Sequence, residues 1–136
     1  LSVRRVRELS SGIIELLNSD GDAPWTVGVL RRHLLTPSFH LFVGYLGDTP
    51  VTMASLTPLS QATALSDVMT HQAHRRKGYA RTLLQQVVAH HRRTSRNTLY
   101  LFASDPAAIH IFEQLGFVEH PDSPPMWSAY LPQSSL

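Results

Sequence analysis

The segment after Gly78 carries the longest helical pattern of this sequence and restricts what the chain can fold into. Residues suited to a buried face recur three and four positions apart, at Ala80, Leu83, Leu84, Val87, Val88 and His91. This spacing places them on one side of an α-helix, and polar or charged residues such as Gln85 and Arg92 fall on the other side. The sequence therefore predicts an amphipathic helix that packs on the body of a domain.

The remaining strand and helix signals predict an α/β domain with a mixed sheet. Strands are predicted at Ser2–Glu8, Phe39–Leu46, Val51–Leu56, Thr63–Thr70, Thr98–Ala103, Phe117–Glu119 and Met126–Leu131. Helices are predicted from Ser10 or Ser11, at Trp25–Leu35, after Gly78 and from Pro106. The order is β-α-α-β-β-β-α-β-α-β-β, with no internal repeat or linker, so residues 1–136 form one domain with a core at 1–131 and a tail at 132–136.

Specific residues mark several turns and helix ends. The Gly47-Asp48 pair between two strand-like segments predicts a hairpin. Asp105 followed by Pro106 predicts a helix start with Asp105 as the N-cap. Gly116 predicts a left-handed helix end, with Phe117 folded back in hydrophobic contact.

Composition narrows the class of protein. Hydrophobic residues make up 43% of the 136 residues and charged residues 16%, as in a folded globular domain. The chain has no cysteine, which excludes disulfides, thiolate metal sites and a cysteine nucleophile, and no apolar run is long enough to span a membrane. The sequence begins at Leu1 without an initiator methionine, so we expect the natural chain to extend upstream.

Positive charge is concentrated in two places, although the net charge is only +2. One cluster contains Arg75, Arg76, Lys77 and Arg81, and the other contains Arg92, Arg93 and Arg96. A small net charge gives little reason to expect nucleic acid as the partner. The clustering indicates a local anionic partner instead.

The first cluster lies where the strand ending at Thr70 meets the helix that follows Gly78. The first turn of a helix has unpaired N–H groups and a partial positive charge. Gly78 and the small Ala80 let a ligand approach the backbone, and Arg75 offers a fork that matches phosphate oxygens. These residues predict a pyrophosphate cradle, although the spacing is neither that of a P-loop nor GxGxxG.

Two motifs resemble the GCN5-related N-acetyltransferase (GNAT) family. Arg75-x-x-Gly78-x-Ala80 matches the family signature R/Q-x-x-G-x-G/A, and residues 108–117, AIHIFEQLGF, resemble its A-x-x-L-Y-x-x-x-G-F segment. The order of elements over residues 2–131 follows the same plan. The resemblance implies a mixed, mostly antiparallel sheet of six or seven strands with about four helices. It also implies a splay between the fourth and fifth strands that holds acetyl-CoA.

The resemblance also implies how the cofactor is held. The backbone of the strand end at Val68–Thr70 would pair with the pantetheine arm, and an N–H near Met69 would polarise the thioester carbonyl. The amides of 76–81 and the Arg75 side chain would bind the pyrophosphate. The residues expected to bind the cofactor are Val68, Met69, Thr70, Arg75, Arg76, Lys77, Gly78, Tyr79, Ala80, Arg81, Asp105, Ala108 and Phe112.

The sequence departs from the family pattern at two positions. Phe112 stands where the family often has a tyrosine that protonates the leaving thiolate, and Asp105 stands where the family often has an asparagine before the helix. Either another group protonates the thiolate or none is needed, because a thiol of pKa roughly 8.5 leaves readily as its anion.

The candidates for proton transfer are Asp67, His71 and Tyr130. Asp67 is the acid of the strand 63–70, where Leu65, Asp67 and Met69 alternate with Ser66, Val68 and Thr70. It could accept the amine proton, contact the substrate, pair with an arginine or face water. His71 and His74 lie three apart in a loop without a third partner, so no metal site is predicted.

The sequence thus predicts an N-acetyltransferase in which an amine attacks the thioester of acetyl-CoA directly. A CoA-binding module that has lost catalysis is the alternative, and a nucleic-acid-binding domain using the two basic clusters is weaker. The acceptor, a small molecule or a peptide, is not encoded in a readable pattern. The segments 18–25 and 121–125 are expected to line its side, with Trp25 either over the entrance or in packing. We expect a cytoplasmic monomer or homodimer without nucleic-acid or membrane partners.

Overall fold

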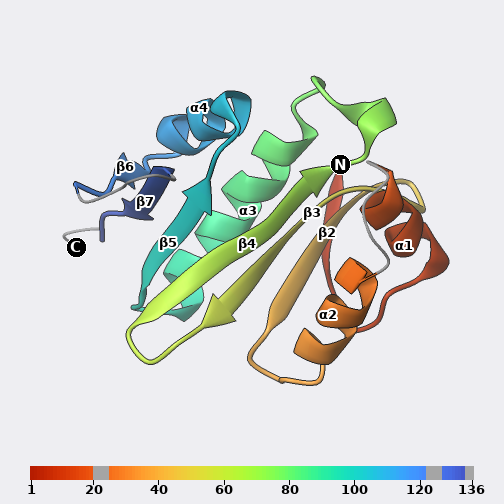
Figure 1. Ribbon diagram of the computed structural model, residues 1–136, viewed down its shortest axis with the longest axis horizontal. Coiled ribbons are helices and arrows are strands. Elements are labelled where there is room, and N and C mark those ends of the chain that lie inside the picture. The colour runs from red at the N-terminus through yellow and green to blue at the C-terminus, as the bar shows by residue number, and fades with distance from the viewer. Residues whose placement is uncertain (20–24, 122–126, 134–136) are drawn as a thin grey trace.

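The computed structural model describes residues 1–19, 25–121 and 127–133, in which one seven-stranded sheet carries helices on both faces. The strands are β1 (Ser2–Val6), β2 (His40–Leu46), β3 (Thr49–Pro58), β4 (Ala62–Thr70), β5 (Thr98–Ala103), β6 (Val118–Glu119) and β7 (Trp127–Leu131). The helices are α1 (Ser11–Asn18), α2 (Trp25–His33), α3 (Tyr79–Thr94), α4 (Pro106–Gln114) and a 3₁₀ turn, η1 (Gln72–His74). The strand order is β1-β2-β3-β4-β5-β7-β6, in which only the β4–β5 pair is parallel (Figure 1). The predicted fold class, a mostly antiparallel mixed sheet with about four helices, is confirmed.

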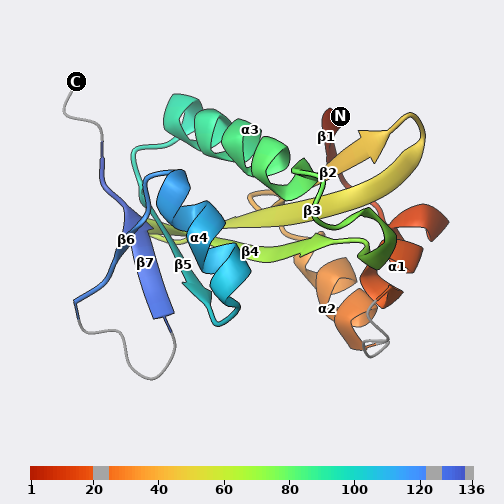
Figure 2. The same ribbon diagram turned by 90° about the horizontal axis from the view of Figure 1, so that it is seen from above.

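Two apolar clusters, one on each face of the sheet, hold the layers together. On the first face, α3 and α4 pack Leu83, Leu84, Val87 and Phe112 against strand residues such as Leu101. On the second face, α1 and α2 cover β2 and β3. Their contacts include Ile13, Leu16, Leu30, Leu41 and Met53. Figure 2 shows α3 on one side of the sheet and α1 and α2 on the other. Each fully buried leucine of α3 contributes roughly 1.5–3 kcal/mol of hydrophobic stabilisation relative to an exposed one.

The predicted turn and cap residues act as expected. Gly47 and Asp48 join β2 to β3, and Gly47 has a positive φ of 61°. The Oδ1 atom of Asp105 accepts a hydrogen bond from the N–H of Ala107, which caps α4. Gly116 has φ 101°, and the N–H of Phe117 returns to the carbonyl of Phe112 at 3.1 Å, so α4 ends in a Schellman motif.

A β-bulge in β4 overturns the simple alternation predicted for 63–70. The register with β3 steps from Ser55–Ser66 to Met53–Met69, so two residues of β4 face one residue of β3. Asp67 takes the left-handed backbone of the bulge, with φ 55°. The extra residue turns each following side chain of β4 to the face opposite to the one that simple alternation predicts. Val68 therefore packs with the first cluster and Met69 with the second.

The sheet opens beyond the first residues of β4 and β5. These parallel strands pair only through Ala62–Ala64 and Thr98–Tyr100. Within the described ranges, the rest of β4 has no ladder partner on its β5 side. The predicted splay between the fourth and fifth strands is therefore present.

Several helix and strand boundaries in the structure differ from those predicted from the sequence. The first strand ends at Val6 rather than Glu8, and α2 ends at His33 rather than Leu35. Val29 of α2 is exposed. The strand β3 is longer than predicted, Thr49–Pro58. The predicted strand start at Met126, most of the acceptor-side segments 18–25 and 121–125, and the end of the tail lie outside the described residues. No helix in the described ranges has the length and apolar character that crossing a membrane requires.

Candidate functional site

A pocket of about 650 Å³ lies where β4 ends and where α3 and α4 begin. These three segments come together because the splay separates β4 from β5 at this end of the sheet (Figure 1). The residues that line the pocket are Val68, Met69, Thr70, His74, Arg75, Arg76, Gly78, Tyr79, Ala80, Arg81, Leu84, Asp105, Ala107, Ala108, Ile111 and Phe112.

The loop between β4 and α3 forms one wall of the pocket and is tied to the sheet. The backbone N–H of His71 donates to the carbonyl of Val51 at 2.8 Å, which fixes the exit from β4. Nε of Arg75 donates to the carbonyl of Thr70 at 3.1 Å. Arg76 has a positive φ of 65°, a backbone conformation that is costly for a residue other than glycine. Such strain is maintained only where the surroundings demand it, which is typical of ligand sites.

The start of α3 offers backbone donors to an anion. Gly78 is the N-cap of α3 and, having no side chain, makes no capping hydrogen bond. The first intrahelical bond described here runs from the N–H of Thr82 to the carbonyl of Gly78. The amides of Tyr79, Ala80 and Arg81 precede it and, by helix geometry, lack helical acceptors. The dipole of this 16-residue helix adds partial positive charge at the same point.

Gly78 leaves open space over these amides. Its φ of 81° is left-handed, and no heavy atom lies within 4 Å of the position that a Cβ would occupy. A ligand can therefore approach the backbone at the wall of the pocket. The residues present fit a diphosphate group, since amide donors, a helix N-terminus and the Arg75 and Arg81 side chains meet here.

The wall formed by α4 is mostly apolar. Phe112 is buried, and its ring lies 5.8 Å from that of Phe117, so it serves the core as well as the pocket. Ala108 and Ile111 are half-buried and also line the pocket. The carboxylate of Asp105 lies at the N-terminus of α4, whose dipole partly offsets its negative charge.

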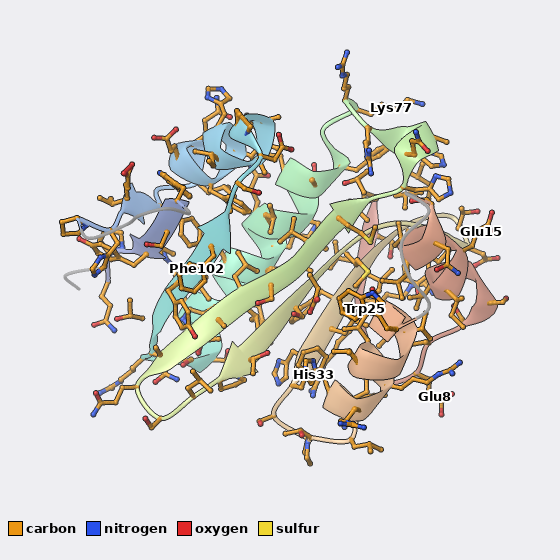
Figure 3. All side chains as sticks on the ribbon, in the orientation of Figure 1. Glu8, Glu15, Trp25, His33, Lys77 and Phe102 are labelled. Carbon is orange, nitrogen blue, oxygen red and sulfur yellow. The ribbon has the colours of Figure 1, made fainter. Side chains whose placement is uncertain are left out.

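All of the residues predicted to hold the cofactor line this pocket except Lys77. Figure 3 shows the labelled Lys77 on the β4–α3 loop, projecting away from the body of the molecule. Four lining residues were not predicted: His74, Leu84, Ala107 and Ile111. Helical spacing could have indicated two of them, because Leu84 lies one turn after the predicted Ala80 and Ile111 lies one turn after the predicted Ala108.

The predicted catalytic residues do not line the pocket. Asp67 is exposed at the bulge directly before Val68 and accepts a 2.6 Å hydrogen bond from Oγ of the buried Ser55. Nδ1 of His71 accepts from the N–H of Ala73, so His71 caps η1. Tyr130 lies on β7, paired in register with Tyr100 of β5. In the described ranges, no group of three or more metal-binding side chains is gathered.

A second cavity, of about 730 Å³, lies at the other end of α3. It is lined by residues of the helix end and the chain terminus, among them His91, Arg92, Arg96, Leu131 and Gln133. The C-terminal end of a helix carries partial negative charge and exposes carbonyls, which disfavours an anion. Although this cavity is the larger, the chemistry of a phosphate site is at the start of α3.

The pocket thus lies where a splayed sheet meets a helix N-terminus whose amides suit an anion. The chain belongs to the acetyltransferase (GNAT) family, because the profile of that family matches residues 11–117. No curated protein matches the chain.

Solved structures of several acetyltransferases share the fold. The chain is 19% identical to the ribosomal-protein-S18-alanine N-acetyltransferase from Escherichia coli, with a TM-score of 0.80 over 99% of this chain and 95% of that one. A GNAT family acetyltransferase from Elizabethkingia anophelis with acetyl-CoA bound is 12% identical, with a TM-score of 0.77 and 97% of both chains covered. A mutant of the spermidine N-acetyltransferase SpeG from Vibrio cholerae is 17% identical, with a TM-score of 0.75 over 96% and 94%. At these identities the likeness concerns the fold.

Proposed function

We propose that the protein is an acetyl-CoA-dependent N-acetyltransferase that transfers the acetyl group to a primary amine. The observation that carries the proposal is the pocket in which the unpaired end of β4 meets the uncapped start of α3. A phosphate-bearing thioester needs both parts, one for its anionic end and one for its amide-containing arm. We propose that either a small molecule or a peptide supplies the amine.

The start of α3 binds the anionic end of the cofactor in this proposal. The amides of Tyr79, Ala80 and Arg81 and the charge of Arg75 meet the pyrophosphate oxygens. Gly78 keeps a side chain out of the way. The cofactor's role is to supply an activated acetyl group, and the chain's role is to hold it at the strand end.

The strand end Val68–Thr70 places the thioester. Its edge facing β5 is unpaired in the described register, so its backbone groups are available to the pantetheine amides. An N–H near Met69 polarises the thioester carbonyl as the amine nitrogen attacks. The new C–N bond forms, the C–S bond breaks, and the sulfur leaves as a thiolate.

The amine must lose a proton, because a free amine of pKa about 10 is mostly protonated at neutral pH. We propose that Asp67 holds the ammonium group and takes its proton, directly or through water. Asp67 suits this role because it is exposed and directly precedes the strand end that places the thioester. His71 and Tyr130 remain secondary candidates. Phe112 has no proton to donate, so the thiolate leaves unassisted by that position.

Turnover with amines tests the proposal. Acetyl-CoA is incubated with the protein and a panel of amines, thiol release is followed, and the acetylated amine is identified by mass spectrometry. Turnover is expected with at least one amine, and Arg75→Ala should weaken acetyl-CoA binding while the protein stays folded. If acetyl-CoA produces neither a thermal shift nor calorimetric heat, the proposal is wrong.

A CoA-binding module without catalysis is the second candidate. It is favoured by one observation, the absence of a hydroxyl at Phe112 on the pocket wall. Tight binding of acetyl-CoA without turnover on a broad amine panel would establish this alternative instead.

A further inference from the structure

One half of the second face of the sheet carries no helix. The helices α1 and α2 cover β2 and β3 on that face, whereas no described helix crosses in front of β5 and β7 (Figure 1). On β5 and β7 the residues that point to the opposite, first face are buried under α3 and α4, namely Leu99, Leu101, Ala129 and Leu131. The residues between them therefore point to the uncovered half. We call this surface the open face, defined by Tyr100, Phe102, Val118 and Tyr130.

The open face is aromatic and apolar. Tyr100 and Tyr130 are register partners on neighbouring strands, and Tyr130 is in turn the partner of Val118 on β6. The Tyr100 and Phe102 rings lie 6.0 Å apart, edge to face. Phe102 is 63% exposed and Val118 is 45% exposed, so a large apolar surface faces solvent. Such a contiguous patch indicates a binding surface.

Trp25 adds a further exposed aromatic ring on the same side of the sheet. It begins α2, which packs on the second face, and its side chain is 68% exposed. The sequence left open whether Trp25 is a packing residue, and this exposure excludes the core. In Figure 3 the labelled Trp25 and Phe102 lie on either side of β4, Trp25 from α2 and Phe102 from β5.

One carboxylate accompanies these rings. Ser55 points to the second face, because Ala54 and Leu56 on either side of it pack with the first cluster. Its hydroxyl donates to Asp67, which places that carboxylate on the second face as well. Among the described residues of β4, β5, β6 and β7, the only other acid is Glu119. It pairs with Ala129 and so faces the first cluster.

The open face adjoins the point at which acetyl transfer is proposed. Asp67 directly precedes Val68 and Met69, which line the cofactor pocket. The bulge turns Val68 to the first face and Met69 to the second, so this short segment of β4 contributes to both faces. Because Met69 packs on the second face and also lines the pocket, an amine held at Asp67 can reach a thioester placed at this strand end.

We propose that the acceptor is a monoamine whose carbon skeleton carries an aromatic ring, with the ring on the open face and the ammonium at Asp67. This inference rests on the proposed N-acetyltransferase function. Phe102 and Tyr100 stack with the ring of the substrate. A monoamine needs one carboxylate, and among the described residues of β4, β5, β6 and β7 Asp67 is the one on the second face.

Matched amines test this inference. The kcat and KM values are measured for 2-phenylethylamine, ethylamine and spermidine, and calorimetry measures the binding of each amine to the CoA-saturated protein. We expect 2-phenylethylamine to have the highest kcat/KM and the tightest binding. Phe102→Ala should raise its KM about tenfold and leave kcat and acetyl-CoA affinity unchanged. Phe102 is exposed, so this variant should fold, and Leu35→Ala, which removes an exposed leucine just beyond the other end of α2 from Trp25, is the control.

The outcomes separate the inference from the function on which it rests. The proposal of an aromatic acceptor is wrong if the enzyme prefers spermidine, acetylates only peptides, or keeps the same KM in Phe102→Ala. Each of these results would leave the proposed acetyltransferase function standing. Failure to bind acetyl-CoA would instead overturn the function itself.

Discussion

Oγ of Ser55 donates a 2.6 Å hydrogen bond to Oδ2 of Asp67, the residue that takes the left-handed position of the β4 bulge. The bond ties a buried hydroxyl of β3 to an exposed carboxylate of β4. It holds the carboxylate on the second face of the sheet, directly before the strand end that lines the pocket. The bulge thus positions a charge as well as bending the strand.

Asp67→Asn should lower kcat/KM for the amine roughly a hundredfold, because the amide cannot take the amine proton. Asparagine tolerates the left-handed backbone and can still accept from Ser55, so stability should change little. Steady-state kinetics and thermal unfolding measure both effects. Ser55→Ala is the matched control, since it removes the hydrogen bond and keeps the charge. Equal activity in Asp67→Asn and the unmodified protein would remove Asp67 from the mechanism.

Gly78→Ala should destabilise the protein by roughly 1–2 kcal/mol, since a left-handed backbone is unfavourable for a residue with a Cβ. It should also weaken acetyl-CoA binding, because the new methyl group enters the open space over the α3 amides. Calorimetry gives the affinity for acetyl-CoA, and chemical denaturation gives the free energy of unfolding.

Gly28→Ala is the control. Gly28 lies within α2, no atom would contact its Cβ within 4 Å, and alanine there should stabilise the helix by about 0.5–1 kcal/mol. Unchanged affinity in Gly78→Ala would mean that the cradle is misplaced.

Asp105→Asn should tighten acetyl-CoA binding severalfold. The carboxylate lines the pocket and repels phosphate oxygens, whereas asparagine is an equally good N-cap for α4. Titration calorimetry at low salt shows the effect most clearly, because salt screens the repulsion. Glu113→Gln removes a charge from α4 outside the pocket and should leave the affinity unchanged. Weaker binding by Asp105→Asn would indicate that the carboxylate contacts the cofactor favourably.

Acid should destabilise the fold through a pair of histidines far from the pocket. His40 and His90 lie with ring centroids 5.6 Å apart beside Phe42. Burial lowers the pKa of both, and nearby arginines, Arg5 for His40 and Arg93 for His90, lower each pKa further. The unfolded chain, with histidine pKa near 6.5, therefore binds more protons. The stability that these residues contribute is fully present above about pH 6.5 and is lost as the pH falls toward the folded pKa values.

His90→Phe should reduce this loss, because phenylalanine keeps a ring beside Phe42 and cannot be protonated. It should also stabilise the neutral protein by about 1 kcal/mol, since Nε2 of His90 is buried without a hydrogen-bond partner in the described chain. Urea unfolding at several pH values between 5 and 8 gives the slope of the unfolding free energy against pH. A slope equal to that of the unmodified protein would contradict this account.

Local patterns predicted the parts of the structure that depend on local chemistry. The α3 stripe, the Asp105 cap and the Gly116 end follow from helix geometry, and each is present. The grouping of Val68–Thr70, Gly78 and Ala108 around one pocket came from the resemblance to a family, and the structure brings them together.

Features that depend on tertiary contacts were not predictable in the same way. The bulge at Asp67 is a mismatch between two strands, and no residue type in β4 demands it. Helical spacing placed His91 on the buried face, but its partner, the carbonyl of Asn97 at 2.8 Å, lies beyond the end of its helix. The exposure of Phe102 depends on where α1 and α2 pack, which its own strand does not encode.

The most direct test of the central claim, that the cofactor binds where β4 meets α3, is an NMR titration of the ¹⁵N-labelled protein with CoA. The two cavities lie at opposite ends of α3, so backbone amides distinguish them. The largest shifts are expected at Val68–Thr70 and Gly78–Arg81. Shifts confined to residues 91–97 at the other end of α3, or none at saturating CoA, would contradict the account.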